Sequence, residues 1–523
     1  MQNRSFPRKA KKASQKVRRS VFSFLFNRLT ISALLILLQL ALVVSAFVFL
    51  QGRIKHLYNI LRVISLVVII WLIRKPDNPA YKISWIIIIL ILAPIGSLFY
   101  LFWGNTPFNR ARLIKIRPID VTRIEPSHPS ATHELCTRLP RHRRNCQYLH
   151  SIAEMPAWKD TATEYFPVGE FMFESMLSEL KKAKRFIFME FFIIDRGHMW
   201  DAILDILRKK AAEDVDVRVM YDDVGCISKL PHNYSKTLES MGIRVIRFNR
   251  FVPMLNTYFN YRDHRKICVI DGNVGYTGGI NLADEYINEK ERFGHWKDTG
   301  VKLTGSGVAN LTALFLQLWD FSVGSTTENL EDYLPTITAP SDGYVQAFAD
   351  SPLDDYNVSE TVFLNIINNA TRSVYITSPY LALDNEMITA LCNAAESGID
   401  VRIVTPGIPD KKSVYLITRS YYAQFIRAGV RIYEYTPGFI HAKMIVADND
   451  VAVVGTINMD FRSFYLHFEC GTVFYRGSVV DKVRSDILET IEKSEEIDAH
   501  WIKSYPWIKS IGASLLSLLI PLM

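Results

Sequence analysis

The sequence lacks the residue patterns of several common kinds of functional site. Its six cysteines show no CxxC spacing, which excludes a zinc framework or a dense disulfide scaffold and predicts free thiols. It also has no glycine-rich loop of the P-loop type and no pair of carboxylates with metal-binding spacing. We therefore expect neither a metal nor a nucleotide cofactor.

Excess positive charge is confined to the first residues. The net charge is +8, but residues 1–28 hold nine Lys and Arg and no acidic residue, so the rest of the chain is close to neutral. A nucleic-acid-binding protein would be basic on its folded part, so nucleic acid is not an expected partner. A basic tail at 1–28 beside an apolar run is typical of a cytoplasmic flank, and it can also contact anionic lipid headgroups.

Long apolar runs are concentrated near the N-terminus. Three follow the tail, at about 31–50, 57–73 (with Arg62 near its start) and 83–103 (with Tyr100 and Trp103 at its end). Runs of this length predict helices that cross a bilayer, so we expect a transmembrane region at 29–105. Three crossings would put the rest of the chain on the side opposite the tail, whereas a middle run lying in the interface would put it on the same side.

The remainder of the chain has the composition of an α/β protein and contains an internal repeat. Three collinear matches define it: "AKRFIFME" with "ATRSVYIT", "DVRVMY" with "DVRIVT", and "HRKICVID" with "HAKMIVAD". Each copy alternates apolar strands with helical periodicity, which predicts two α/β halves packed about a pseudo-two-fold axis. We expect a connecting segment at 106–160, repeats at 161–335 and 336–500, and an apolar segment at 501–523 that rests on the bilayer surface.

The third match predicts a site made from both repeats. Side chains two positions apart in a strand point to the same side, so His264 shares a face with Lys266, and His441 with Lys443. Packing of the halves about a two-fold axis would bring the two histidine-containing strands together.

The returning strand adds polar groups to this site with the same spacing of two. It delivers Gly279 and Asn281 in the first copy, and Thr456 and Asn458 in the second. We expect these residues to help bind a phosphate.

Four carboxylates accompany the repeated motif. Asp271 and Asp448 complete it and are candidate catalytic residues by motif, but they fall at turns, where they are better placed to hold a hairpin than to touch substrate. Each imidazole also needs a carboxylate on its other nitrogen to fix its tautomer. Asp298 and Glu469, each downstream of the histidine in its own repeat, are the candidates.

The pooled side chains suit phosphoryl transfer. Two ammonium groups and two amides can neutralise phosphate oxygens, where charge is concentrated during the reaction. One imidazole can attack phosphorus while the other protonates the departing alkoxide and then activates the incoming hydroxyl.

The motif HxKxxxxD followed by GGxN or GTxN resembles the signature of the phospholipase D superfamily. "NPAYKISWIIIILILAPIGSLFYLFWG", "GGINLADEY", "HWKDTGVKLTG" and "SPY" also resemble bacterial cardiolipin synthases, so the similarity covers about residues 57–523. This resemblance implies a multi-pass protein of the bacterial plasma membrane whose partners are phosphatidylglycerol and anionic lipids, with self-association into a homo-oligomer also compatible.

The resemblance also implies a reaction. Two phosphatidylglycerol molecules would give cardiolipin and glycerol through a phosphohistidine, with His264 as nucleophile and His441 as general acid and base, an assignment that near-symmetry makes reversible. A phospholipase D or transphosphatidylase that uses water or another alcohol is the first alternative. A catalytically silent membrane scaffold is the second.

Overall fold

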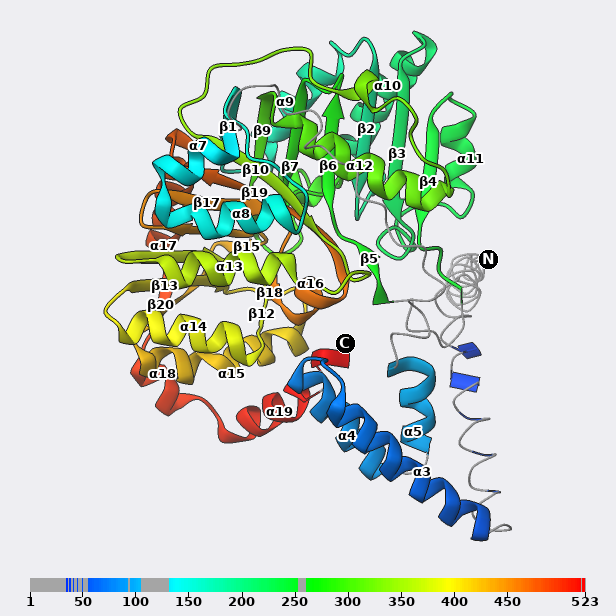
Figure 1. Cartoon of the computed structure of the whole chain (residues 1–523), viewed down its shortest axis with the longest axis vertical. Coiled ribbons are helices and arrows are strands. Elements are labelled where there is room, and N and C mark those ends of the chain that lie inside the picture. The colour runs from blue at the N-terminus through cyan, green and yellow to red at the C-terminus, as the bar shows by residue number, and fades with distance from the viewer. Residues whose placement is uncertain are drawn as a thin grey trace, which may run out of the picture. The chain divides into compact units, whose positions relative to one another are not determined.

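A computed structural model describes the chain at residues 55–92, 95–104, 131–252, 260–518 and 520–522, with isolated residues between 34 and 49. It divides into a small unit (residues 1–108 and 250–259) and a large unit (109–249 and 260–523) (Figure 1). The basic tail at 1–28, most of the predicted run 31–50 and the first part of the connecting segment lie outside the described residues.

The described part of the small unit is helical. Its elements are α3 (Lys55–Arg74), α4 (Pro79–Ile91), α5 (Ile95–Phe99) and the π-helical turn η1 (Tyr100–Gly104). α4 begins at Pro79 because the Asn78 side chain accepts a hydrogen bond from the Ala80 amide at 2.9 Å, and proline lacks the N–H that a first helical position cannot use. Ser65 Oγ on α3 lies 3.0 Å from Ser97 Oγ on α5.

The predicted transmembrane region is wrong for the helices that the structure describes, because none of them is both long enough and apolar enough to cross a bilayer. α3 has 20 residues but contains Arg62, and it begins at Lys55 and ends at Arg74. The run 83–103 contains Pro94, which has no N–H for a helical hydrogen bond, and it is divided between α4 with 13 residues and α5 with 5. At its rise per residue α4 is about 20 Å long, against about 30 Å for a hydrocarbon core.

The first repeat forms a seven-stranded sheet in the order β1-β9-β7-β6-β2-β3-β4. β2, β3 and β4 are parallel, and the other neighbours pair antiparallel. The strands are β1 (Thr161–Phe166), β2 (Phe186–Phe191), β3 (Asp216–Asp222), β4 (Arg244–Phe248), β6 (Lys266–Ile270), β7 (Val274–Gly278) and β9 (Gly300–Gly305). The helices are α9 (Gly169–Leu180), α10 (His198–Ala212), α11 (Tyr234–Glu239), α12 (Val308–Val323) and the 3₁₀ turn η5 (Asp284–Ile287).

The second repeat forms a sheet in the order β10-β19-β17-β16-β11-β13-β14-β20. Its strands are β10 (Tyr344–Asp350), β11 (Ser373–Thr377), β13 (Asp400–Pro406), β14 (Arg431–Tyr435), β16 (Met444–Ala447), β17 (Val451–Gly455), β19 (His467–Tyr475) and β20 (Ser494–Ile497). The helices that accompany it are α13 (Val358–Asn369), α14 (Asn385–Glu396), α15 (Lys412–Ala428), α16 (Phe461–Tyr465), α17 (Ser478–Glu492), α18 (Ala499–Ser504) and α19 (Trp507–Ser517). Up to β14, each strand occupies the position of its counterpart in the first sheet, which confirms the predicted pair of α/β repeats.

Smaller elements complete the large unit. α7 (Ala131–Arg138), η3 (Pro140–His142) and α8 (Arg143–Ser151) precede the first sheet, η6 (Leu330–Tyr333) links the repeats, β12 (Leu381–Ala382) pairs with β18 (Met459–Asp460), and η7 (Ile520–Leu522) follows α19.

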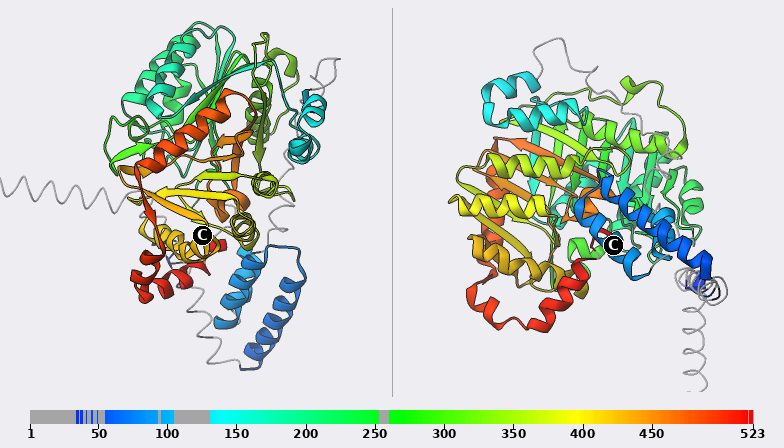
Figure 2. Two further views of the ribbon diagram at one scale, coloured as in Figure 1. Left: turned by 90° about the vertical axis from the view of Figure 1, so that its left-hand side faces the viewer. Right: turned by 60° about the horizontal axis from the view of Figure 1, so that its bottom comes forward.

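Two short strands cross from one repeat to the other. β5 (Arg262–Asp263) of the first repeat pairs in parallel with β19, and β15 (Gly438–Ile440) of the second pairs in parallel with β8 (His295–Lys297). Helix α17 lies across strands of both sheets (Figure 2). There Asp486 accepts hydrogen bonds from Tyr165 and, at 2.7 Å, from Lys297 of the first repeat. The repeats are therefore interlocked at the ends of the strands that lead to His264 and His441.

Candidate active site

His264 of the first repeat is held by the second repeat. It follows β5, and its backbone amide donates to the Phe468 carbonyl on β19 at 2.9 Å. The next residue of β19, Glu469, places both carboxylate oxygens 2.9 Å from His264 Nδ1. The Nδ1 atom is thus engaged, and the lone pair on Nε2 is the one available for chemistry.

His441 of the second repeat is held by the first in the same manner. It follows β15, and its amide donates to the Lys297 carbonyl on β8 at 2.7 Å. The next residue, Asp298, places Oδ2 2.6 Å from His441 Nδ1. The prediction that each histidine pairs with the carboxylate of its own repeat is therefore wrong. The pairs cross, because β5 and β15 each extend out of their own sheet to join a strand of the other repeat.

The two motif lysines are buried at the same place. Lys266 Nζ donates to the His264 carbonyl at 2.6 Å, and Lys443 Nζ donates to the His441 carbonyl. Burial lowers the pKa of Lys266 to about 8, partly opposed by Glu469. Burial also lowers the pKa of Lys443 to about 7, with Asp298 opposing the shift and the charge of Lys266 adding to it. Lys266 interacts electrostatically with Glu469, and Lys443 with Asp298, which in each case belongs to the other repeat. The two motifs therefore meet in one site.

Both imidazoles are neutral near pH 7. Burial lowers the pKa of His264 well below its usual value, and Lys266, His467 and Lys443 add to the shift. Burial and Lys443 lower the pKa of His441 to about 4, against the opposing effect of Asp298. Neutral rings keep a free lone pair, which a nucleophile or a general base requires.

The two carboxylates differ in their surroundings. Glu469 also accepts hydrogen bonds from the Thr456 hydroxyl and, at 2.8 Å, from the Ser463 hydroxyl, yet burial raises its pKa well above its usual value. Burial alone would raise the pKa of Asp298, but His441 and Lys443 outweigh this effect, so the pKa of Asp298 is lowered.

The four predicted phosphate-binding residues lie around these pairs, mostly engaged with protein groups. The Asn281 side chain accepts from the Ile193 amide at 2.9 Å and donates to Tyr286 at 2.8 Å. Gly279 leaves space for Asp298, the carboxylate that pairs with His441. A Cβ at position 279 would lie 2.0 Å from Asp298 Oδ1. In the described part of the chain, Asn458 Oδ1 has no hydrogen-bond partner.

Asp271 and Asp448 lie at the far ends of β6 and β16 from the histidines. Both have a positive φ of 54°, and each accepts hydrogen bonds from three successive backbone amides, residues 184–186 for Asp271 and 371–373 for Asp448. They join a hairpin turn to the start of a central strand.

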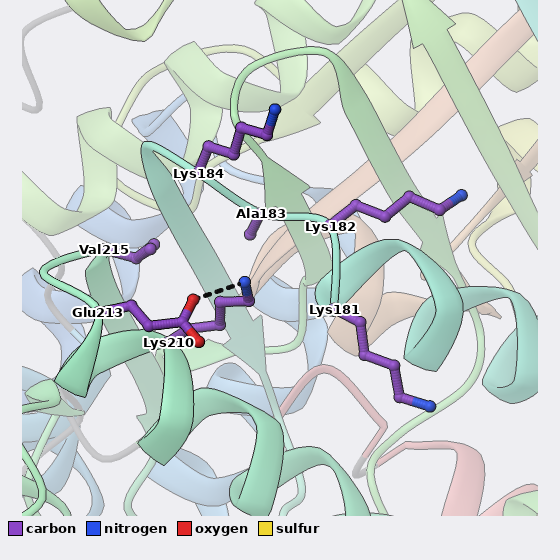
Figure 3. A pocket seen from close by; sticks show the side chains of 7 residues that line it. All are labelled: Lys181, Lys182, Ala183, Lys184, Lys210, Glu213 and Val215. Carbon is purple, nitrogen blue, oxygen red and sulfur yellow. Dashed lines mark hydrogen bonds and ion pairs between the residues drawn. The ribbon is translucent and has the colours of Figure 1, made fainter.

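A surface pocket beside the first of these turns contains no candidate site residue. It is lined by Lys181, Lys182, Ala183, Lys184, Lys210, Glu213 and Val215 (Figure 3). Its lysine side chains point apart, and Lys210 pairs with Glu213 at 2.8 Å. The groups do not converge as an anion site requires.

Sequence reasoning did not find two residues that lie next to Glu469. Ser463 donates to it from α16, and His467 lies with its ring centroid 5.4 Å from that of His264. His467 precedes Glu469 by two residues on one strand, so the spacing rule used for His264 and Lys266 would have indicated it.

Comparison with known proteins identifies the family. The model for "Cardiolipin synthase, PLD-like domain" matches residues 176–319 and 363–491, and the model for "Phospholipase_D-nuclease N-terminal" matches residues 63–105. A cardiolipin synthase of Geobacillus kaustophilus is 34% identical over 94% of this chain and 99% of its own length. The chain belongs to the cardiolipin synthase family. The predicted resemblance and the expectation of a phospholipase D-type phosphatidyltransferase are confirmed.

Two further relatives and one solved structure are also similar to this chain. A cardiolipin synthase of Alkalihalophilus pseudofirmus is 34% identical over 95% of this chain and all of its own. An uncharacterized protein of Streptococcus mutans is 42% identical over 87% of this chain and 98% of its own. A phosphatidylserine synthase of Haemophilus influenzae has the same fold, with a TM-score of 0.57 at 14% identity over 73% of this chain and 100% of that one.

Proposed function

We propose that this protein transfers a phosphatidyl group from one phosphatidylglycerol to another, releasing glycerol and forming cardiolipin. The observation that supports this most is the crossed arrangement of His264 with Glu469 and His441 with Asp298. It makes one buried site with two imidazoles and two ammonium groups, and it needs both repeats.

In the first step, His264 Nε2 attacks phosphorus. The N–P bond forms, the bond from phosphorus to the glycerol oxygen breaks, and His441 gives its proton to that oxygen. His441 is neutral in the free protein, but the negative charge of a bound phosphate favours its protonated form. Lys266 and Lys443 neutralise the non-bridging oxygens.

In the second step, the hydroxyl of another phosphatidylglycerol attacks the phosphohistidine. Its proton passes to His441, the new P–O bond forms, and the P–N bond to His264 breaks. One phosphodiester replaces another, so atoms and charge balance without any co-reactant.

The test uses full-length protein reconstituted into vesicles of phosphatidylglycerol, without added metal or nucleotide. We expect cardiolipin and glycerol in equal amounts by mass spectrometry and a coupled glycerol assay. His264→Ala should abolish both products, whereas His198→Ala, which removes an imidazole outside the site, should not. Phosphatidic acid as the main product would instead indicate a hydrolase, and no product from the wild-type protein would indicate a scaffold.

Helix α19 exposes apolar side chains that could contact the bilayer, where both proposed substrates lie. Trp507, Ile508, Ile511 and Leu515 are 71%, 66%, 51% and 61% exposed. We propose that this face of α19 lies in the membrane interface, so that the protein acts on lipids at the surface of the cell membrane.

Vesicle flotation tests this contact. A variant with Trp507→Ser and Ile511→Ser should bind phosphatidylglycerol vesicles more weakly than one with two serines on the exposed residues Phe171 and Val252. Equal flotation would exclude α19 as the contact. That no nucleic acid binds and that the chain self-associates remain proposals, which gel-shift assays and mass photometry would test.

A further inference from the structure

His467 has no role in the reaction proposed above, yet it is buried beside the nucleophile. It is 8% exposed, and neither of its ring nitrogens has a hydrogen-bond partner among the residues that the structure describes. Burying a polar ring without a partner is unfavourable, so such a group usually has a ligand or water to satisfy it.

His467, His264 and Glu469 offer three metal-ligand atoms in one place. Glu469 Oε1 lies 2.9 Å from His264 Nδ1 and 3.5 Å from His467 Nδ1, and the ligand atoms of the three residues all lie within 4.8 Å of one another. Two imidazoles with one carboxylate form a set that Zn²⁺ binds, with an open fourth position.

The neighbouring charges restrict which cation can enter. Lys266, Arg262, Arg462 and Lys411 all act on His467, and their positive charge opposes any cation. Mg²⁺ and Ca²⁺ prefer several oxygen ligands and would find one carboxylate here. Zn²⁺ gains more from the two nitrogen ligands and is the ion that this set favours.

We propose that His264, His467 and Glu469 bind Zn²⁺, and that the bound ion inhibits the enzyme. The metal takes the Nδ1 lone pair of His264, so the ring's single proton, which Nδ1 shares with Glu469 in the free protein, has to move to Nε2. Nε2 then has no lone pair with which to attack phosphorus. This consequence rests on the proposed role of His264 as nucleophile.

Among the residues that the structure describes, the other half of the site has no matching third ligand. The rings closest to His441 belong to Tyr286, Trp296 and Phe439, at centroid distances of 5.3, 5.5 and 5.9 Å. The inference therefore predicts one inhibitory ion per chain, on the His264 side.

The experiment compares full-length wild type, His467→Gln and His295→Gln in detergent micelles. His295 begins β8 and lies three residues before Asp298, but its Nδ1 lies 3.0 Å from the Tyr435 hydroxyl. We expect Zn²⁺ to inhibit the wild type and His295→Gln alike. His467→Gln should need about tenfold more Zn²⁺ or higher, since the loss of even an outer-shell partner weakens a metal site by that factor.

Binding is measured separately from turnover. Titration with Co²⁺ should give the visible absorption of a site with nitrogen ligands in the wild type and in His441→Gln. His467→Gln should bind one equivalent of Co²⁺ per chain fewer than the wild type. Equal Co²⁺ uptake by His467→Gln and wild type would overturn the inference. If Co²⁺ binds as expected but no variant makes cardiolipin, the proposed function fails and the metal site stands.

Discussion

The two halves of the site share one topology but differ in how the carboxylate is supported. Glu469 is held by two hydroxyl groups besides His264, and burial raises its pKa. Asp298 fits against Gly279, accepts from the Thr299 amide at 2.8 Å, and has a lowered pKa. Asp298 therefore keeps its charge and can stabilise a protonated His441, whereas Glu469 does so less for His264.

This difference between the carboxylates distinguishes the nucleophile from the general acid, two roles that the near-symmetry of the site leaves open. A general acid must gain and lose a proton in each cycle, so it benefits from a fully ionised partner. A nucleophile must keep its lone pair, so a partner that orients the ring without favouring its protonation is better. We therefore propose that His441 has the first role and His264 the second.

Substitution of the histidines gives the largest expected effect. His264→Gln and His441→Gln should each lower kcat by about a thousandfold or more, since both steps lose a nucleophile or a general acid. Only His441→Gln should accumulate a phosphatidyl adduct, detected on the His264 peptide by mass spectrometry under mild alkaline conditions. An adduct on His441 in His264→Gln would reverse the assignment.

Substitution of the carboxylates should sharpen the comparison. Asp298→Asn should lower kcat by about a hundredfold or more, in the range of general acid–base catalysis, because the protonated His441 loses its counter-ion. Glu469→Gln should lower kcat less, because His264 needs an acceptor that orients its ring rather than a counter-ion, and the amide oxygen can still accept from Nδ1. Steady-state kinetics on both variants is the measurement, and a larger loss in Glu469→Gln would contradict the comparison.

Gly279 and Thr456 occupy matching positions in the two motifs, but position 279 requires the absence of a side chain and position 456 requires a hydroxyl group. Gly279→Ser would place Cβ 2.0 Å from Asp298 Oδ1, so it should displace that carboxylate and lose nearly as much activity as Asp298→Asn. Thr456→Ser keeps the hydroxyl that donates to Glu469 and should retain most activity. Equal activity of the two variants would show that space for Asp298 does not matter.

The lysines give a smaller effect that depends on pH. Their pKa values of about 7 for Lys443 and about 8 for Lys266 mean that the charged forms, which bind phosphate, are present below those values and are lost as pH rises through them. We expect kcat/KM for phosphatidylglycerol to fall between pH 7 and 9. Lys443→Arg should flatten the lower part of this fall, since arginine stays charged. An identical profile in the variant would exclude Lys443 as its source.

The sequence was sufficient for the repeat, the α/β class and the site's composition, because a duplicated motif with a strand period of two constrains which side chains share a face. It was not sufficient for the pairing of histidines with carboxylates. That pairing depends on β5 and β15 joining strands of the other repeat, and such contacts leave no local periodicity.

The apolar runs misled for a different reason. Hydropathy measures the content of a segment but not where its helix ends. The run 83–103 is apolar throughout, yet α4 ends at Ile91 and α5 begins at Ile95, on either side of a segment containing Pro94.

Asp271 and Asp448 should give the smallest effect on catalysis, and they test whether the motif's last residue is structural. Replacing either with alanine leaves three backbone amides without their acceptor, which should lower the free energy of unfolding by roughly 3 kcal/mol. Asp448→Ala should cost more than Asp271→Ala, because Asp448 also pairs with Arg141 and accepts from Thr371 Oγ1 at 2.9 Å. Denaturant unfolding measures this order, and kcat per folded molecule should stay near the wild-type value in both. A loss of kcat in a variant that is folded to the wild-type extent would contradict a purely structural role for the aspartate.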